Sequence, residues 1–555
     1  MRSTIYSAIL SLKSLLAYEH GYGNVLPLSP EDLQKRLNEV ALPAEANATA
    51  RARAASIEDL EPTSLEYVDT YYYLDHLLRL PWSSVPETKI DVLSLSKKLQ
   101  MGHFAPRFVH ESLVEFLASY CSTPKRLGIS KPDVPVLVGP EGTGKRTLGK
   151  KIGTAIDRPV EIVDLRLMGS DSGIFGTISD RGRGHPGAIV NALQRAGRRD
   201  AVVVLANVEW AIRSWENHGL SMINLVFDER ERERFRDRFL DVEFNLSDVL
   251  FVLTINALDF LPPEVYAKLL PIECPGYTKT RKLDLIQQEL LPSLLEKHNI
   301  TEDDFALQAD AAEVLVTDYA LEPGVTILQS ALDEACRKVA AGKLLKRSPP
   351  AKIDPEVLRG LLGIPRKYHA ALGRLGQTGM AKGILGSIEG ASVEIIEVAT
   401  VPGSRGFTVV GQQVDDVGRI IDIAYNFVRS RMTELDLSAR QLYEYGYTFN
   451  HRISPDNHDA PSMSLAILVS LVSALRDKFV DPELALTGDM TLRGKVVGVP
   501  GLEHKLLSAQ RHGIRRMIIP KANEPDLDDL PDTLANEMSI VTIDEVEQAL
   551  RIALQ

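Results

Sequence analysis

Helical and strand-like hydrophobic patterns occupy different parts of the chain. Residues 29–59 and 67–82 carry apolar side chains at helical spacing. The second stretch has one apolar stripe, formed by Leu74, Leu77, Leu78 and Leu80. From about residue 133 the pattern changes to short β-branched runs, PVLVG, VEIVDL, AVVVLA and DVLFVLT, separated by helical stretches. Strands that alternate with helices predict a parallel sheet covered on both faces.

Two further regions follow the strand-rich one. Residues 275–345 return to a helical pattern, and the polar, proline-containing segment 346–352 has the composition of a linker. A second α/β region starts near Leu361 and continues to the end. The patterns predict a multidomain α/β fold with four parts, at residues 1–120, 121–275, 276–350 and 361–555.

Length and composition are those of a globular protein with several domains. At 555 residues the chain exceeds what one hydrophobic core usually supports. No apolar run approaches the roughly 20 residues of a membrane span. We read the first 18 residues as an amphipathic helix rather than a signal peptide, because Ser11, Lys13 and Ser14 interrupt the apolar pattern.

Charge and cysteine content limit which partners and which cellular compartment we expect for the protein. The formal net charge of -12 argues against strong nucleic-acid binding, because phosphate contacts need clustered Lys and Arg. The alternating charges of RERERFRDR, residues 230–238, are typical of a solvated helix face. Three widely spaced cysteines, Cys121, Cys274 and Cys336, indicate neither disulfides nor a metal site. We therefore expect a cytoplasmic protein with no metal and no membrane contact.

The run GPEGTGK, residues 139–145, is the first candidate for chemistry. It follows a predicted strand and opens a helix, the context in which backbone N–H groups cradle a phosphate. The cofactor-binding residues would be Gly139, Gly142, Gly144 and Lys145. The next position should be Ser or Thr to bind magnesium, but it is Arg146. Thr147 comes one residue late and would point about 100° away around the helix.

The strand AVVVLA should be followed by an acidic pair that holds magnesium. Ala206 and Asn207 occupy that position. Glu209 lies two residues after Asn207, and we favour an ordinary exposed acid there over a replacement for the lost carboxylate. The sequence thus indicates a degenerate phosphate-binding loop with weak or no nucleotide binding.

The segment HDAPSMSLAILVSLVSAL, residues 458–475, is the second candidate. It feeds a short loop into an apolar helix, and a serine there lies near free backbone N–H groups that suit an oxyanion. Taken alone, Ser462 would more often be a helix cap than a nucleophile. A Ser/His/Asp arrangement with His458 is open on composition, but His458 would need an unusual backbone path to reach Ser462 Oγ.

Several stretches resemble the Lon protease family: YLDHLLRLPW, VLVGPEGTGKRTLGK, LTINALDFLPPEVYAKL and the C-terminal half. The resemblance runs from about Leu28 to the end, and we expect no counterpart of that family's large N-terminal substrate-binding domain. It implies an AAA+ α/β subdomain at 121–275 with a helical lid at 276–350. It also implies a Lon-type serine peptidase domain at 361–555.

The family's catalytic serine and lysine have counterparts here. Its D-G-P-S-A-G pattern corresponds to DAPSMS at 459–464, and its G-G-L-x-x-K pattern to PGLEHK at 500–505. The nucleophile is then Ser462 and the base Lys505, which must be desolvated on an apolar wall to be neutral near working pH. We expect Leu502, Leu506 and Ala509 to form that wall. Lys505 would take the Ser462 Oγ proton, and the serine would form an acyl-enzyme.

The resemblance also implies roles for two neighbours of this pair. Thr487 in LTGD would help to position the lysine, and Asp459 would shape the loop. We regard Lys495 and Lys521 as surface or structural lysines. Glycines of the family pattern are replaced here by Ala460, Ser464 and Pro500. The added side chains would change how the active-site loop opens, and the proline would stiffen the turn before Lys505.

Other AAA+ residues of the family show a pattern of loss. Asn256 matches the sensor-1 asparagine, but Lys268 replaces the arginine finger and Thr326 the sensor-2 arginine. The pore loop, aromatic in the family, aligns with Arg181 and Gly182. Losing the finger alone costs about 10³ to 10⁵ in rate, so ATP hydrolysis should be negligible.

These motifs predict an ATP-independent serine endopeptidase, most similar to the branch called LonC, for which ATP and magnesium are dispensable. By resemblance, a homohexameric ring would enclose the Ser462/Lys505 dyads in a chamber that admits unfolded or loosely folded polypeptides. Two alternatives stay open: an ATP-dependent Lon protease with atypical nucleotide motifs, and a ring that holds unfolded chains without cutting them.

Overall fold

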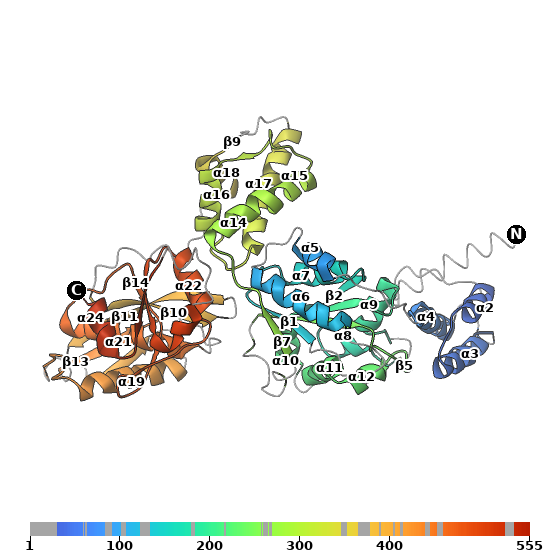
Figure 1. The fold of residues 1–555 in the computed structure, drawn as a ribbon, viewed down its shortest axis with the longest axis horizontal. Helices are drawn as coiled ribbons and strands as arrows, with labels where there is room; N and C mark the ends of the chain where they lie inside the picture. The colour runs from blue at the N-terminus through green and yellow to red at the C-terminus, as the bar shows by residue number, and fades with distance from the viewer. Residues whose placement is uncertain are drawn as a thin grey trace. The chain divides into compact units, whose positions relative to one another are not determined.

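The structure is a computed structural model, drawn as a ribbon in Figure 1. It describes residues 30–58, 60, 64–83, 92–100, 107–122, 134–178, 184–215, 218–256, 258, 265, 269–345, 352–363, 378–387, 390–402, 406–410, 415–438, 444–451, 459–527 and 538–554. The chain divides into two compact units, Met1–Val138 with Gly144–Cys274, and Gly139–Thr143 with Pro275–Gln555. The amphipathic helix expected at the N-terminus lies outside the described residues, as do residues 346–351 of the predicted linker 346–352; its last residue, Lys352, begins strand β9 (Lys352–Ile353).

Three helices begin the described part of the first unit: α2 (Pro30–Glu39), α3 (Ala44–Glu58) and α4 (Leu65–Arg79). Helix α4 begins at Ser64, whose hydroxyl accepts a hydrogen bond from Tyr67 N at 3.2 Å. Its predicted apolar stripe is confirmed, because Leu74, Leu77, Leu78 and Leu80 are all buried. The Tyr73 hydroxyl donates to Leu240 O at 2.5 Å and joins α4 to the α/β part of this unit.

A five-stranded parallel sheet forms the α/β part, in the order β2-β3-β6-β1-β7. The strands are β1 (Val134–Val138), β2 (Val160–Asp164), β3 (Val202–Ala206), β6 (Leu250–Ile255) and β7 (Leu269–Glu273). Alternate residues of β3 enter different cores, Val203 and Leu205 on one face and Val202 and Val204 on the other. The predicted parallel sheet with two covered faces is therefore confirmed.

The helices of the α/β part divide between these two cores. Helices α5 (Val92–Gln100), α6 (Arg107–Ser122) and α7 (Lys145–Ala155) belong to the core that contains Val202. The other core takes residues from α8 (Ser172–Phe175), α9 (Ala188–Ala196), α10 (Val208–Ser214) and α11 (His218–Phe227). Helix α7 is the one that follows the glycine-rich loop, so its first turn faces the ends of the strands.

The charged run at 230–238 is only partly the solvated helix that the sequence predicts. Helix α12 (Glu229–Glu233) is exposed or half-buried, but the helix ends there and the short strand β4 (Phe235–Arg236) pairs with β5 (Glu243–Phe244). Asp237 is buried and accepts hydrogen bonds from the backbone N–H groups of Gly187, Phe239 and Leu240. Burial raises the pKa of Asp237 to about 6. The prediction failed here because the chain leaves the helix at Glu233, and the short strand and turn that follow bury Phe235 and Asp237.

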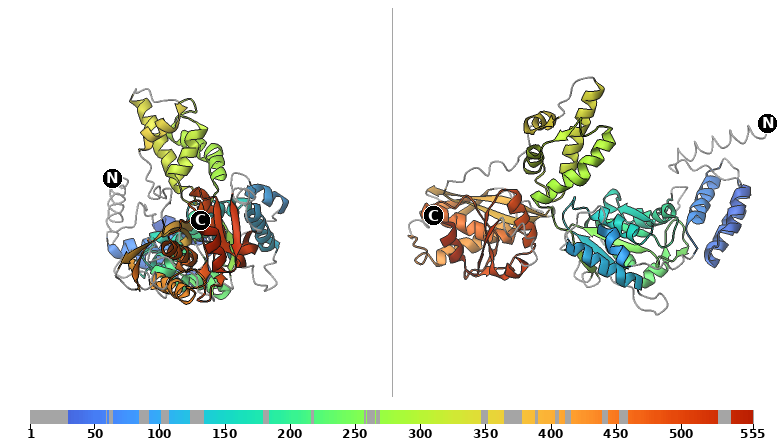
Figure 2. Two further views of the ribbon diagram at one scale, coloured as in Figure 1. Left: turned by 90° about the vertical axis from the view of Figure 1, so that its left-hand side faces the viewer. Right: turned by 45° about the horizontal axis from the view of Figure 1, so that its top comes forward.

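A helical region begins the larger segment of the second unit (Figure 2). Its helices are α14 (Lys279–Leu285), α15 (Leu291–His298), α16 (Ala309–Val314), α17 (Thr326–Leu344) and α18 (Pro355–Leu362). Strand β9 (Lys352–Ile353) pairs with β8 (Ala306–Leu307), and Leu358 of α18 joins the same core. The helical region thus extends to Leu362, beyond the boundary at residue 350 that the sequence pattern gives.

A seven-stranded mixed sheet forms the C-terminal region, in the order β12-β13-β11-β10-β14-β17-β18. Its strands are β10 (Met380–Ser387), β11 (Gly390–Pro402), β12 (Gly406–Val410), β13 (Tyr445–Asn450), β14 (Leu484–Leu486), β17 (Arg516–Pro520) and β18 (Ser539–Ile543). Strand β11 pairs antiparallel with β10 and β13, whereas β10, β14, β17 and β18 run parallel. A small hairpin, β15 (Asp489–Met490) with β16 (Val496–Val497), follows β14.

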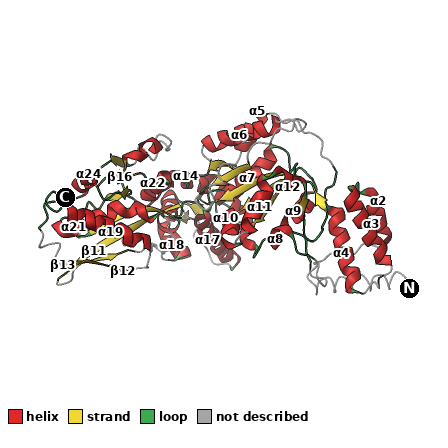
Figure 3. Cartoon of the chain, turned by 90° about the horizontal axis from the view of Figure 1, so that it is seen from below, coloured by secondary structure: helices red, strands yellow, loops and turns green. Residues whose placement is uncertain are grey.

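Helices pack on both faces of this sheet (Figure 3). Helices α19 (Asp415–Ser430), α21 (Ser464–Arg476) and α24 (Val546–Ala553) share one core with Ala381 and Leu385 of β10. Helix α22 (Leu502–Arg511) packs on the other face with Ile384. Strand β10 therefore lies between α21, which follows the turn that contains Ser462, and α22, which contains Lys505. In the part of the chain that the structure describes, no helix is long and apolar enough to cross a membrane.

Candidate active site

Ser462 lies in a short turn directly before a buried helix. Residues Ala460–Met463 form a 3-10 turn, and α21 follows with every side chain buried except those of Ala474 and Arg476. Ser462 itself is fully buried. Its backbone N–H donates to Asp459 O at 3.1 Å, and its carbonyl accepts from Gly488 N at 2.9 Å. The turn thus fixes the serine backbone between two neighbouring segments.

Lys505 is fully buried on α22 and reaches the serine. Its Nζ lies 2.7 Å from Ser462 Oγ. The predicted apolar wall is present, since Leu502, Leu506 and Ala509 are buried in the core of that face. Burial lowers the pKa of Lys505, and the Asp459 carboxylate opposes this by favouring the ammonium form. The net direction is downward, as a lysine base requires.

Asp459 contacts both members of the pair. Its Oδ2 lies 2.8 Å from Lys505 Nζ and its Oδ1 accepts from Ser462 Oγ at 2.6 Å. Oδ2 also accepts from Gly386 N at 2.5 Å. The donors and acceptors balance with Lys505 as an ammonium and Asp459 as a carboxylate. The sequence predicted a loop-shaping role for Asp459, whereas the structure brings it into direct contact with Ser462 and Lys505.

Thr487 lies near this cluster but bonds elsewhere. Its side chain is fully buried, and its hydroxyl donates to Ile384 O at 2.9 Å rather than to Lys505. Its backbone N–H donates to Ile518 O at 3.1 Å. Thr487 therefore braces strand β10 against its neighbours, and any effect on the lysine acts through the backbone of β10.

The three residues that replace glycines of the family pattern are Ala460, Ser464 and Pro500. Ala460 and Ser464 are fully buried, and the Ser464 hydroxyl contacts Pro461 O and Asp489 Oδ1. Pro500 is exposed, and Gly501 after it takes a left-handed conformation at φ 63° that starts α22.

The other candidate side chains near the site lie apart from Ser462 and Lys505 or outside the described residues. Lys495 is exposed and pairs with Glu545, and Lys521 is exposed too, as expected for surface lysines. His458 lies outside the described residues.

The first turn of α7 and the strand ends form a polar cluster in the first unit. Lys145 is buried and its Nζ donates to Asn256 Oδ1 at 3.1 Å. The Arg146 guanidinium forms an ion pair with Asp164 at the end of β2. Asn207 Nδ2 donates to Asp164 Oδ1 at 2.7 Å. The two residues that replace magnesium ligands thus both bind the same carboxylate.

This carboxylate is stabilised as an anion. Burial alone would raise the pKa of Asp164, but hydrogen bonds from Asn207 and Arg166 and the charge of Arg146 hold it below its usual range. Thr147 is exposed. Lys268, Arg181 and Gly182 lie outside the described residues.

Glu209 corrects a prediction from the sequence. It is buried, at 7% exposure, and not an exposed acid. Burial raises its pKa, while backbone N–H groups, including that of Asn256, and the charge of Lys145 act in the opposite direction. Its Oε2 has no hydrogen-bond partner among the described residues. Sequence reasoning missed it because the start of α10, and not the strand itself, turns this side chain inward.

The glycine-rich loop 139–143 belongs to the second unit and packs against the segment before α17. Val325 N donates to Gly142 O at 3.2 Å, and Tyr277 OH donates to Thr143 O at 3.0 Å. A Cβ on Gly142, which has φ +79°, would lie 2.6 Å from Thr326 Oγ1. Thr326, which replaces the family's sensor-2 arginine by resemblance, therefore lies beside the loop with an uncharged side chain.

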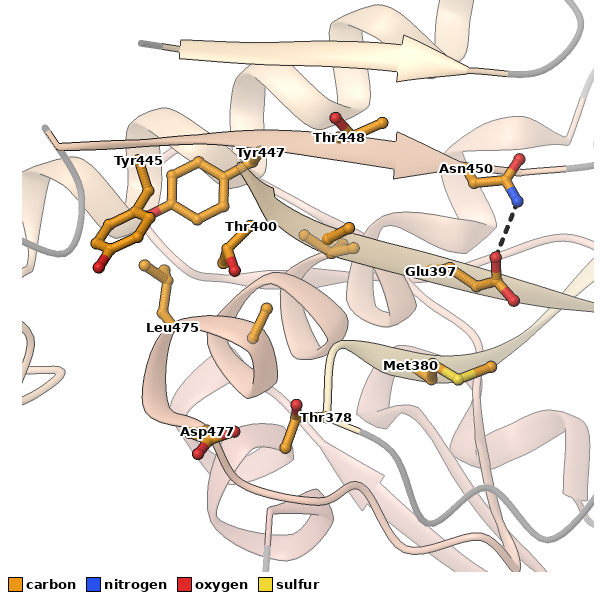
Figure 4. A pocket seen from close by; sticks show the side chains of 13 residues that line it. Thr378, Met380, Glu397, Thr400, Tyr445, Tyr447, Thr448, Asn450, Leu475 and Asp477 are labelled. Atoms are coloured by element: carbon orange, nitrogen blue, oxygen red, sulfur yellow. Dashed lines mark hydrogen bonds between the residues drawn. The ribbon is translucent and has the colours of Figure 1, made fainter. Parts of the chain in front are cut away.

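A cavity of about 730 Å³ opens at the far end of α21. Figure 4 shows Tyr445, Tyr447 and Thr400 on its wall, with Asn450 bonded to Glu397 at 2.9 Å. Asp477, also in the wall, follows the C-terminus of α21, whereas Ser462 precedes its N-terminus. The 13 residues of α21 separate these ends by about 20 Å. The cavity is therefore not the site of the serine and lysine.

The C-terminal region has the features of a serine peptidase, with a buried serine, a buried lysine and a carboxylate in mutual contact between two helices of an α/β domain. Residues 352–555 match the family model described as the Lon protease (S16) C-terminal proteolytic domain. The chain belongs to the Lon protease family.

Full-length comparisons agree with this assignment. The Lon protease of Roseiflexus castenholzii is 30% identical over 521 residues, which are 94% of this chain and 65% of that protein. The Lon protease of Desulforamulus reducens is 27% identical over 518 residues, 93% of this chain and 64% of that protein. Lon protease 2 of Herpetosiphon aurantiacus is 28% identical over 555 residues, 98% of this chain and 66% of that protein. The chain thus spans about two thirds of the length of these curated relatives.

Proposed function

We propose that this protein is an ATP-independent endopeptidase of the LonC type, in which Ser462 is the nucleophile and Lys505 the general base. Its substrates are unfolded or loosely folded polypeptides, and it works as a cytoplasmic homohexamer that encloses the sites in a chamber. The observation that carries the proposal is the 2.7 Å contact between two fully buried groups, Lys505 Nζ and Ser462 Oγ. Burial of a lysine is unfavourable because its charged form loses hydration. A role in activating the neighbouring serine explains why the lysine is nevertheless buried.

The geometry supports a stepwise proton transfer. In the described conformation Asp459 accepts a hydrogen bond from the Ser462 hydroxyl and pairs with Lys505 as an ammonium. For Lys505 to act as a base, it must lose one proton and its contact with Asp459 must loosen. The neutral amine then takes the Ser462 Oγ proton, the serine attacks the peptide carbonyl, and the ammonium returns the proton to the leaving amine.

The residues at the glycine-rich loop do not fit a magnesium nucleotide. The ion takes oxygen ligands, but the position after Lys145 holds a guanidinium that is paired with Asp164. Asn207 Nδ2 donates a hydrogen bond to the same carboxylate. A divalent cation placed there would meet the fixed positive charge of Arg146. These contacts support the loss of ATP hydrolysis while the sheet and its helices keep their packing.

Casein and peptide hydrolysis, each with and without ATP and magnesium, tests this function. The proposal expects equal rates under both conditions and a loss of at least about 10³-fold in Ser462→Ala and Lys505→Ala. Lys495→Ala is the matched control, because this lysine is exposed and pairs with Glu545. A strong stimulation by ATP would contradict ATP independence, and full activity in Ser462→Ala would contradict the assigned nucleophile.

A second candidate, an ATP-dependent Lon protease with atypical motifs, is favoured by one observation. Glu209 is buried close enough to Lys145 for their charges to interact, and its Oε2 lacks a partner. It could supply the carboxylate that Asn207 lacks. Glu209→Gln separates the two candidates, because it would abolish ATP stimulation in the second and leave hydrolysis unchanged in the first.

A ring that holds unfolded chains without cutting them is the remaining alternative. Light scattering of the full chain measures its assembly, and a hexamer is expected for both ring functions. Hydrolysis of casein by the wild type, lost in Ser462→Ala hexamers, supports the peptidase. A wild-type hexamer that suppresses aggregation but cuts neither casein nor peptides supports the holding function instead.

A further inference from the structure

Ser464 links the turn of the nucleophile to a neighbouring hairpin. It is the first residue of α21 and is fully buried. Its Oγ lies 2.7 Å from Pro461 O and 2.9 Å from Asp489 Oδ1 of strand β15. A hydroxyl carries one proton, so the two acceptors share it. Both contacts depend on a side chain that the family's glycine at this position would not provide.

The contact with Pro461 fixes a peptide group next to the nucleophile. The carbonyl of Pro461 and the N–H of Ser462 belong to one planar peptide group. The carbonyl accepts from Ser464 Oγ, and the N–H donates to Asp459 O at 3.1 Å. Rotation of this group would disturb both hydrogen bonds. The Ser464 hydroxyl therefore stabilises the tight turn in which Asp459 reaches back to Ser462.

The hairpin provides a firm anchor for this contact. Asp489 Oδ1 also accepts from Met490 N at 2.7 Å, which orients the carboxylate. The preceding residue, Gly488, donates to Ser462 O at 2.9 Å and accepts from Leu465 N at 3.2 Å. Ser462 and Leu465, on either side of Ser464, are thus both hydrogen-bonded to Gly488, the residue directly before the hairpin.

We infer that Ser464, anchored by Asp489, is a positioning residue that holds the Asp459 carboxylate on Lys505 and so keeps the site in a resting form. This rests on the proposed chemistry of Ser462 and Lys505. The charged groups around the lysine are Asp459 from the turn and, beyond Ser464, Asp489 from β15; Glu503 and His504 precede it on α22.

Loss of the Ser464 hydroxyl would let the turn unwind more often. Asp459 would then spend less time on Lys505, and the lysine would give up its proton at lower pH, because the carboxylate is what favours the ammonium form. The acid limb of kcat against pH should therefore move to lower pH, with KM unchanged. One hydrogen bond of this kind changes an equilibrium by about threefold to tenfold, which sets the expected rise of kcat at pH 7.

The test is a kcat–pH profile of the full chain with a fluorogenic peptide. Ser464→Ala should shift the acid limb and raise kcat at pH 7 as stated. The same substitution in an Asp459→Asn background should have no further effect, because the carboxylate through which it acts is gone. Asp489→Asn keeps the Oδ1 acceptor and hence the anchor, so it should shift the acid limb less than Ser464→Ala does. Asp489→Ala removes the anchor and should shift the limb in the same direction as Ser464→Ala.

Two results would overturn the inference while the proposed function stands. One is a fall in kcat in Ser464→Ala and Asp489→Ala without movement of the acid limb. The other is an equal effect of Ser464→Ala with and without the Asp459 carboxylate. Ser462→Ala tests the chemistry separately: if it retains activity, or if the wild type has none, the proposed function and this inference fail together.

Discussion

The buried ion pair of Lys505 and Asp459 makes a quantitative prediction about stability. Removing one partner of a buried pair typically costs about 3–5 kcal/mol, because the other charge stays buried. Here Lys505 is 0% exposed, but the Asp459 side chain is 15% exposed and keeps hydrogen bonds from Gly386 N–H and Ser462 Oγ–H. We therefore expect Lys505→Met to cost about 2 kcal/mol of local stability. In Lys505→Met/Asp459→Asn neither charge remains, so most of that loss should be recovered.

Hydrogen exchange of the full chain measures this effect locally, which avoids the overlapping unfolding of several domains. A loss of 2 kcal/mol corresponds to about 30-fold faster exchange of the protected amides in α22. Lys495→Met is the control: its pair with Glu545 is exposed and screened by solvent, so this substitution should leave the exchange rates essentially unchanged. Unchanged exchange in Lys505→Met would refute the reasoning, as would a double variant that exchanges as fast as the single one.

Three further predictions concern activity and packing. Asp459→Asn should move the acid limb of kcat to lower pH, because the carboxylate raises the pKa of Lys505 against the effect of burial; a shift to higher pH would contradict this sign. Gly488→Ala should lower the stability by about 1–3 kcal/mol and reduce kcat. Gly488 has φ +154°, and a Cβ there would lie 2.5 Å from Leu465 Cδ1. Thermal unfolding measures the stability and peptide hydrolysis measures kcat. Arg146→Ala should leave casein hydrolysis without ATP within about twofold and cost at most about 1 kcal/mol, because its side chain is 41% exposed; a large loss of activity would assign this arginine a working role.

The parallel sheet of the first unit was predictable from sequence because buried parallel strands are nearly continuous apolar runs. VVVLA becomes β3 with all five side chains buried, and Asn207 follows directly in a left-handed conformation at φ 61°. Resemblance to a family supplied the pairing of Ser462 with Lys505, which no local pattern contains. Two helices on opposite faces of β10 bring these residues together, and that depends on the topology of the whole sheet.

The errors arise where a side chain's direction depends on tertiary packing. Thr487 was expected to help to position the lysine, but its hydroxyl donates to the carbonyl of Ile384, so any such effect is indirect. Asp459 was expected to shape a loop, yet the 3-10 turn points its carboxylate at both Ser462 and Lys505. Acidic residues at the start of a helix are usually solvated, which is why Glu209 was misjudged. In each case the residue type indicated a polar role, but the partner of the side chain could not be predicted from the sequence.

The protonation of Glu209 bears on the choice between an ATP-independent and an ATP-dependent peptidase. A buried carboxyl with an unpartnered oxygen can be stabilised by a cation or by a proton. Burial is the largest influence on the pKa of Glu209 and raises it, despite Lys145 nearby and the backbone N–H groups that bind the charged form. A carboxyl must lose its proton to bind a divalent cation, so a raised pKa weakens metal binding by this group. Asp164, the carboxylate that is held ionised, is already engaged by Arg146 and Asn207. Glu209, which could bind a metal, thus has a raised pKa, whereas Asp164, whose pKa is lowered, is already bound by Arg146 and Asn207; both observations favour the proposed loss of ATP hydrolysis.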